Sequence, residues 1–269
     1  MSIITGKGGF IRSRKVSGFD PDALDFITRV EAVEGALEPA VKAAWNKFIV
    51  DCKNDPSPFA GVSNYRAIKS CCLPGAKTLS GFLVNLKPEA STITNINFIN
   101  DDWNRYRIKG NGTNKALNSN RRCDEDPQDN CHLAIWITEP TQSVNIQIGA
   151  RTLADTNQDK LMFSNEFRLN NGVLTSVGLV EVVGFRGASR INSNSYSYIH
   201  GVDDVGVINR TSSAPSSLSM YVMARNLDNN INMPTDIGLS YFSIGEGVNL
   251  ETLKNRTATL IADITAALS

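Results

Sequence analysis

LAIWI, residues 133–137, places its large aliphatic side chains at every second position and Trp136 at the opposite parity. This period of two is typical of a β-strand, whose successive side chains point to opposite faces of a sheet. Short apolar runs separated by Asn, Asp, Gly and Ser clusters recur from Leu79 to Ile244. Many short strands with turns between them predict an antiparallel β-sandwich, and the absence of helical patterns between the runs excludes a parallel α/β fold. The predicted strands are Phe82–Leu86, Asn104–Lys109, His132–Thr138, Val144–Ala150, Lys160–Ser164, Glu166–Leu169, Val177–Phe185, Ser195–His200, Val205–Arg210, Ser217–Ala224 and Leu239–Ile244.

Helical patterns flank this β region on both sides. Asp20-Pro21 and Glu38-Pro39 each place a proline in a first helical turn, and a shorter helix is predicted from Tyr65 to Cys72. Near the C-terminus, Asn249 is a good N-cap for a helix with one apolar face. We therefore predict an N-terminal arm (1–18), a helical segment (19–76), a β-sandwich (77–248) and a C-terminal helix packed on the body (249–269). The fold class is mainly β.

Composition excludes several classes of protein. Hydrophobic residues make up 41% of the 269-residue chain, and 27 basic residues balance 27 acidic ones. A neutral chain lacks the basic surface that captures nucleic acid or anionic membranes, so we expect neither partner. No apolar run approaches the roughly 20 residues of a membrane span, and the N-terminus lacks a secretory signal. We expect synthesis in a cytoplasm.

The cysteines leave one question open. The chain has five, at positions 52, 71, 72, 123 and 131, and no C-x-x-C pair of the kind that binds zinc. Cys123 and Cys131 bracket the acidic loop CDEDPQDNC and would close it if they were oxidised. Reduced thiols are the alternative, and they are typical of proteins made in a cytosol.

Three long segments resemble a family of bacteriophage tail-associated proteins. They are Phe19–Lys53, Lys109–Thr138 and Leu239–Ile264, in the same order as in that family. The resemblance implies a concanavalin A-like, LamG-like jelly roll in a tail fibre or adsorption module, made in the bacterial cytoplasm and located in the virion. It also implies other virion proteins as partners and a homo-oligomer, with a trimer as the default. Residues 1–18 and the pair Cys123 and Cys131 depart from the family pattern.

The arm carries the predicted assembly contacts. Arg12, Arg14 and Lys15 follow a Gly-rich start. Their charge is too small to indicate nucleic-acid binding, so we expect the arm to dock on a neighbouring virion protein.

Host-surface glycan is the predicted ligand of the sandwich loops. Aromatic faces stack on sugar rings, while amides and carboxylates hydrogen-bond hydroxyl groups. The candidates are Trp103, Tyr106, Tyr196, Tyr198, Asn192, Asn194 and Asp203. The alternative interpretation is that Trp103 and Tyr106 pack in the core and that SNSYSY, which holds Tyr196 and Tyr198, is an exposed strand face.

The acidic loop offers oxygen ligands for Ca²⁺, and LamG-like modules sometimes carry calcium at a rim, which is what the resemblance adds. The candidate ligands are Asp124, Glu125, Asp126 and Asp129. Their spacing does not match a calcium-loop motif, and an acidic turn is the alternative.

Catalysis has little support in the sequence. The chain has two histidines, His132 and His200, and no G-x-S-x-G motif to present a nucleophile. No strand shows the paired carboxylates of a glycosidase. We expect a protein that is not an enzyme. The alternatives are a purely structural capsid decoration, cement or spacer protein, and a glycan depolymerase.

Overall fold

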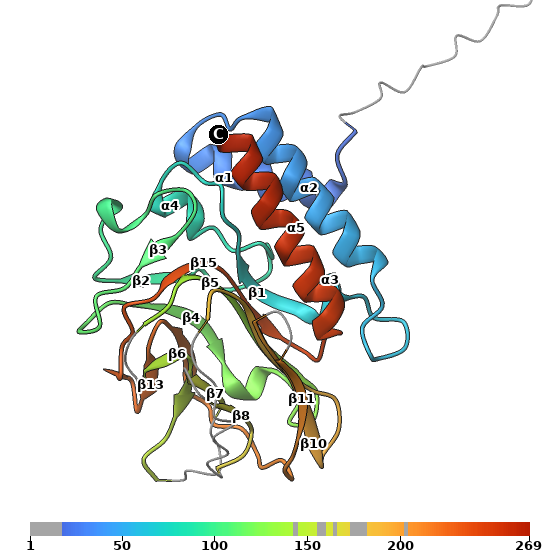
Figure 1. Cartoon of the computed structure of the whole chain (residues 1–269), viewed down its shortest axis with the longest axis vertical. Coiled ribbons are helices and arrows are strands. Elements are labelled where there is room, and N and C mark those ends of the chain that lie inside the picture. The colour runs from blue at the N-terminus through green and yellow to red at the C-terminus, as the bar shows by residue number, and fades with distance from the viewer. Residues whose placement is uncertain (1–17, 142–144, 155–159, 164–165, 173–181, 202–203) are drawn as a thin grey trace, which may run out of the picture.

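A computed structural model describes residues 18–141, 145–154, 160–163, 166–172, 182–201 and 204–269. Two β-sheets pack face to face, and helices cover the outer face of one of them (Figure 1). The predicted mainly β class is confirmed: a sandwich with two N-terminal helices and a C-terminal helix.

The three long helices begin where the sequence indicates. Helix α1 (Pro21–Glu34) is capped by Asp20, whose side chain accepts a hydrogen bond from the Asp22 N–H. Helix α2 (Pro39–Asn54) has a proline in its first turn. Helix α5 (Leu250–Leu268) is capped by Asn249 and packs along α2 (Figure 1). None of the helices in the described ranges has the length and apolar character needed to cross a bilayer.

The first sheet has seven strands, all in antiparallel pairs. In spatial order they are β1 (Ile68–Cys72), β15 (Gly238–Gly245), β5 (Cys131–Glu139), β9 (Gly184–Arg190), β10 (Ser195–His200) and β11 (Asp204–Asn209), with β3 (Ile108–Lys109) also paired to β15. Strand β11 therefore forms one edge of this sheet.

The second sheet has eight strands and one parallel pair, β13 with β6. In spatial order they are β14 (Asn230–Asn232), β13 (Arg225–Leu227), β6 (Ile146–Arg151), β12 (Ser219–Val222), β4 (Ala116–Arg122) and β2 (Thr94–Ile96), with β7 (Lys160–Phe163) on β6 and β8 (Phe167–Leu169) on β7. The short helical elements are α3 (Asn64–Ala67), α4 (Leu79–Phe82), η1 (Asn100–Asp102) and η2 (Cys123–Glu125).

The two faces of the first sheet have different partners. On the inner face, Arg186 of β9 donates a hydrogen bond to Gln147 Oε1 of β6 over 2.6 Å, and it lies over the ring of Phe167 on β8. On the outer face, Tyr241 of β15 meets Phe48 of α2 with ring centroids 6.0 Å apart. The outer face is thus the side that the helices cover.

Three predicted elements are wrong. The helix predicted over Tyr65–Cys72 ends at Ala67 with α3, and strand β1 follows, paired with β15. Cys71 and Cys72 are both buried, which a strand between a helix layer and a second sheet permits. The strand predicted at Phe82–Leu86 is absent: the short helix α4, capped by Thr78, ends at Phe82, and residues 83–86 form a turn and a loop. The strand predicted at Asn104–Lys109 is reduced to β3. Residues 177–181 of another predicted strand lie outside the described residues.

Candidate binding surface

Trp103, a predicted glycan contact, belongs to the core. Its side chain is 7% exposed and stacks on Phe82 of α4, with ring centroids 4.3 Å apart. The indole Nε1–H donates a hydrogen bond to the Ala76 carbonyl over 3.0 Å. An indole whose ring is stacked and whose polar group is satisfied inside the protein has no face left for a sugar.

Tyr196 and Tyr198 lie two residues apart on strand β10, so they share one face of the sheet. Both contact Phe167 of the second sheet, so this is the face inside the sandwich. Tyr196 is 1% exposed, and its hydroxyl donates a hydrogen bond to the Phe167 carbonyl over 2.7 Å. Tyr198 stacks on Phe167 with centroids 5.4 Å apart, and its hydroxyl donates to Asp204 Oδ1 over 3.3 Å. The prediction that these tyrosines lie on a solvent-facing loop is wrong.

Tyr106 and Asn194 remain on the surface but lie apart. Tyr106 is 37% exposed, and its carbonyl accepts a hydrogen bond from Ser240 at the start of β15. Asn194 lies in the β9–β10 hairpin, where its backbone N–H donates a hydrogen bond to Asn192 Oδ1 within the turn. These positions are at opposite ends of the first sheet, so they form no common platform. Asp203 lies outside the described residues.

The acidic loop is neutralised by basic side chains. Asp124 accepts from Arg122 over 2.9 Å, and Glu125 pairs with Arg121 over 3.2 Å. Asp126 is buried and also pairs with Arg121, while Asp129 accepts a hydrogen bond from the Ser212 hydroxyl. No group of three or more His, Cys, Asp or Glu side chains able to hold a metal occurs in the described part of the chain. These carboxylates pair with separate partners and do not converge on one centre, so the loop has the geometry of an acidic turn.

All five cysteines are buried free thiols. Burial raises the pKa of Cys123 to about 11. A buried, protonated thiol is a poor nucleophile and a poor metal ligand. The reduced state, one of the two alternatives for Cys123 and Cys131, is the one that the structure contains.

The proposed arm contacts Arg12, Arg14 and Lys15 fall before the described residues.

His132 is held neutral inside the first sheet. Its Nδ1–H donates to the Glu246 carbonyl over 2.5 Å, because a carbonyl can only accept, and its Nε2 accepts from the Ser243 hydroxyl over 3.0 Å. Burial lowers the pKa of His132 to about 4. Both ring nitrogens are occupied by the protein, so the residue serves the structure of the strand.

A hollow of about 380 Å³ opens between the outer face of the first sheet and the first half of α5. We call it the aromatic hollow. Trp136 and Phe185 are paired neighbours on β5 and β9 and line it from the sheet, while Lys254 and Asn255 line it from the helix. Trp136 is only partly buried. The remaining lining residues are Val183, Gly184, Gly201 and Ala258.

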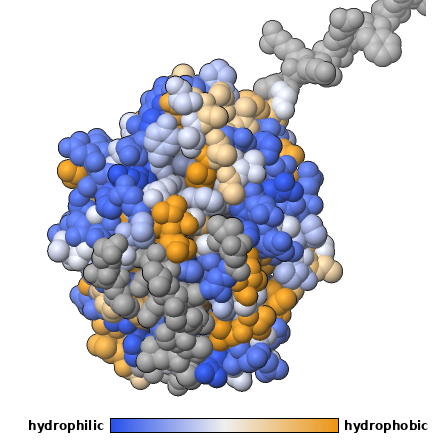
Figure 2. All heavy atoms as spheres, viewed as in Figure 1, coloured by the Kyte–Doolittle hydropathy of each residue, from blue (hydrophilic) through white to orange (hydrophobic). Residues whose placement is uncertain are grey.

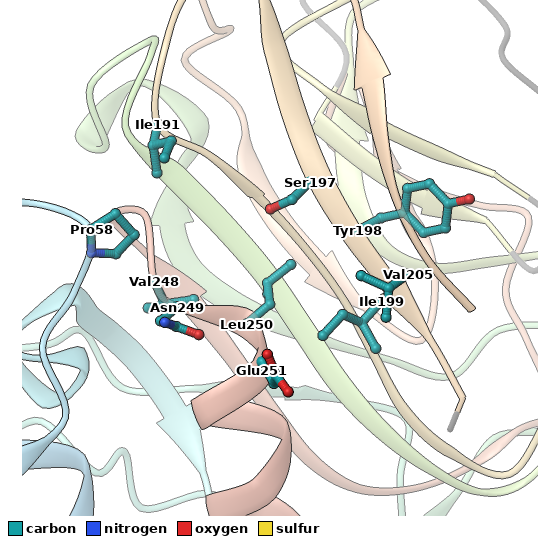
Figure 3. A pocket seen from close by; sticks show the side chains of 10 residues that line it. All are labelled: Pro58, Ile191, Ser197, Tyr198, Ile199, Val205, Val248, Asn249, Leu250 and Glu251. Atoms are coloured by element: carbon teal, nitrogen blue, oxygen red, sulfur yellow. The ribbon is translucent and has the colours of Figure 1, made fainter. Parts of the chain in front are cut away.

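A second hollow of about 250 Å³, the edge hollow, lies at the start of α5, beside β10 and β11 (Figure 3). Its lining residues are Pro58, Ile191, Ser197, Tyr198, Ile199, Val205, Val248, Asn249, Leu250 and Glu251. In Figure 3 the side chains of Ile199 and Val205 lie together, while the ring of Tyr198 points away toward the other side of the strand. The edge hollow is therefore mainly aliphatic.

The aromatic hollow has the features of a small-ligand site. Its volume falls in the range of roughly 300–1,000 Å³ that such sites occupy, with an apolar wall and a few polar groups at the rim. The Trp136 ring supplies a face of negative potential for polarised C–H groups, and Lys254 and Asn255 supply hydrogen-bond donors. None of its described lining residues is a carboxylate. The sequence signal for Trp136 was its parity, opposite to its aliphatic neighbours in strand β5.

Neither a protein-family model nor a curated protein matches the sequence. Among solved structures, the chain is similar to domain 4 of AbnA, a GH43 extracellular arabinanase from Geobacillus stearothermophilus, in complex with arabinotriose. Identity there is 9% over 71% of this chain and 98% of that chain, with a TM-score of 0.41. It is similar to a mutant of HCR/D at 8% identity over 71% of this chain and 51% of that one, with a TM-score of 0.43. A mutant of Trypanosoma rangeli sialidase displaying trans-sialidase activity shares 9% identity over 84% of this chain and 38% of that one, with a TM-score of 0.41.

Proposed function

We propose that this protein is a structural component of a bacteriophage tail, that it is not an enzyme, and that it binds host-surface glycan in the aromatic hollow. The observation that carries the glycan proposal is the position of Trp136, partly exposed beside Phe185 in a hollow whose rim is formed by Lys254 and Asn255. A sugar ring stacked on the indole would place its hydroxyl groups near these two side chains. The tail location rests on the resemblance of three long sequence segments to tail-associated proteins.

The lining of the hollows favours binding over hydrolysis. A glycosidase needs two carboxyl groups flanking the scissile bond, about 5–5.5 Å apart for retention or about 6.5–9.5 Å apart for inversion. Among the residues that the structure describes, no carboxylate lines the aromatic hollow and one, Glu251, lines the edge hollow. A glycan in either hollow would meet no acid–base pair among these described residues.

The glycan proposal is tested with a glycan array and with whole host cells, while released sugar is measured in the same wells. We expect binding without release. Trp136→Ala should weaken binding at least about tenfold, which corresponds to about 1.4 kcal/mol. Tyr106→Ala is the matched control, because it removes another exposed aromatic ring that does not line the hollow, and its affinity should equal that of the wild type. No binding by the wild-type chain would refute glycan recognition, and sugar release would indicate a depolymerase.

The attachment of the protein to the particle is tested separately. Deletion of residues 1–18 should leave a folded domain, since both sheets and the three long helices lie outside this segment. We expect the truncated chain to keep its glycan affinity and to be missing from assembled particles. Incorporation at normal stoichiometry would show that the arm, including Arg12, Arg14 and Lys15, is not the attachment point.

A further inference from the structure

We propose that a second copy of this chain binds along strand β11, so that the first sheets of two copies join edge to edge around a two-fold axis. This interface is independent of the aromatic hollow and of any glycan. It rests on three features of the strand: an unpaired edge, an exposed apolar row and a self-complementary order of charges.

Strand β11 is an unprotected edge. Within the described residues it pairs with β10 alone, so every second residue directs its backbone N–H and C=O away from the sheet. Sheet edges are normally protected by lysine, proline or a bulge, and the strand sequence DVGVIN contains neither lysine nor proline and pairs with β10 in unbroken register. Val205 and Val207 point outward with 62% and 63% of their surfaces exposed. Figure 2 shows hydrophobic residues at the surface at lower right, where Figure 1 places β10 and β11.

The strand matches itself in antiparallel orientation. With Val207 opposite Val207 of the second copy, Asp204 faces Arg210, Val205 faces Asn209 and Gly206 faces Ile208. In each pair both residues have odd numbers or both have even numbers. The exposed residues Val205, Val207 and Asn209 therefore lie opposite one another on one face of the joined sheet, and the even-numbered residues lie opposite one another on the other face. Asp204 is the first residue of β11 and Arg210 directly follows the strand, so an opposite-charge pair would lie at both ends of the seam. Opposite charges across neighbouring strands stabilise their pairing and disfavour shifted registers.

The edge hollow extends this surface on the side that the helices cover. Val205 lines it together with Ile191, which is 44% exposed, and with Leu250 at the start of α5 (Figure 3). A second copy joined at β11 would bring its own Asn209 opposite Val205, at the border of this hollow. Apolar surface beside the seam would therefore lose contact with water as well.

The proposed contact gives an assembly that is complete with two copies. A two-fold interface uses the same patch on both copies and ends at the dimer, whereas a trimer needs two different patches on each copy. The expected assembly through β11 is thus a dimer, in contrast to the trimer that the resemblance implies.

The first test measures the mass of the full-length chain by sedimentation and light scattering over a concentration series. We expect twice the chain mass of 29.3 kDa for the wild type. Val207→Lys should raise the dissociation constant at least about tenfold. Val33→Lys is the matched control, because Val33 is a valine on α1 that is 52% exposed, and it should leave the dimer intact. Equal melting temperatures of the three proteins would show that folding is not affected.

The second test examines the register. Arg210→Asp places two acids opposite each other at both ends of the seam, and Asp204→Arg places two bases there. Each variant alone should be monomeric. An equimolar mixture should form a heterodimer, because both end pairs are then of opposite charge.

Three results would overturn the proposal. They are a monomer or trimer at every concentration of the wild type, a dimer that survives Val207→Lys, and a dimer that is lost when residues 1–18 are deleted. The last result would assign the contact to the arm. If the mixture of charge variants fails to associate while Val207→Lys dissociates the wild-type dimer, the interface stands and the Asp204–Arg210 register is wrong.

Discussion

Asp126 and Lys160 form an ion pair inside the sandwich, with Lys160 Nζ 3.6 Å from Asp126 Oδ2 and both side chains fully buried. Lys160 also donates to the Cys123 carbonyl over 2.9 Å, and Asp126 accepts from Arg121 Nη2 over 2.5 Å. The acidic loop is therefore anchored to strand β7 by its third acidic residue. This contact explains why an aspartate that resembles a calcium ligand in the sequence faces the protein interior.

The two ends of this pair should respond differently to mutation. Asp126→Asn leaves the Lys160 ammonium buried without a counter-charge, which we expect to lower the free energy of unfolding by about 3–5 kcal/mol. Lys160→Met should cost less, because Arg121 still neutralises Asp126. Urea unfolding at pH 7 measures both values. Equal losses would contradict the role assigned to Arg121.

Acid should weaken the fold before the carboxylates titrate, because of His132. Its pKa is about 4 in the folded chain, lowered by burial, against 6.5 as the ordinary value. The unfolded chain therefore binds more protons between these values, and stability falls as the pH drops through that window, by about 3 kcal/mol in total. Urea unfolding at pH 7 and pH 5 should show a loss that His132→Gln reduces. A His132 imidazole that titrates near pH 6.5 by NMR would contradict the burial argument.

Helix α5 should depend on its buried face. Leu260 and Ile264 are each 1% exposed, and burying such an aliphatic side chain contributes roughly 1.5–3 kcal/mol. We expect Leu260→Asp or Ile264→Asp to unfold the protein or to lower its melting temperature sharply, since a charge in this contact has no partner. Ala262→Asp, on the exposed side of the same turn, is the control. Similar melting temperatures for Leu260→Asp and Ala262→Asp would show that the face is not buried in solution.

The cysteine thiols should not react with reagents in the native protein. All five thiols are buried, and burial raises the pKa of each. We expect almost no reaction with a thiol reagent in buffer and five reactive thiols after denaturation without reductant. A count of three would reveal a disulfide, which the position of Cys123 beside Cys131 around the acidic loop would explain.

Strands with clear alternation were predictable from the sequence. In β10 and β11 the predicted and observed ranges agree to within one residue, because apolar and polar positions alternate there. Strand β4 was not predicted, since its sequence ALNSNRR is mostly polar and is held by pairing with β12 and β2. The sequence predicts a helix at the position of strand β1, because the partner that fixes the strand, β15, is about 170 residues away in the chain and local pattern cannot reveal such a pairing.

The candidate site was less predictable than the fold. The amino-acid sequence does not distinguish an exposed aromatic residue from a buried one. The difference lies in which neighbouring residues fill the space around the ring. Trp103 is covered by α4, which the sequence did not predict, whereas Trp136 lies beside a helix that leaves a hollow next to it. The packing of α4 on Trp103 and of α5 beside Trp136 decides which of these two indoles meets solvent.

Both termini of the described chain, residue 18 and the end of α5, lie at the helical pole of the molecule, away from β10 and β11 (Figure 1). A tag, a fluorescent protein or a chip linker fused directly at residue 18 or after α5 would therefore leave the free sheet edge and the first half of α5 directed outward. The same directionality would apply to a molecule tethered by its arm to a larger assembly. Its anchoring end and its recognition end would be opposite poles of one body, so each could change in evolution without disturbing the other.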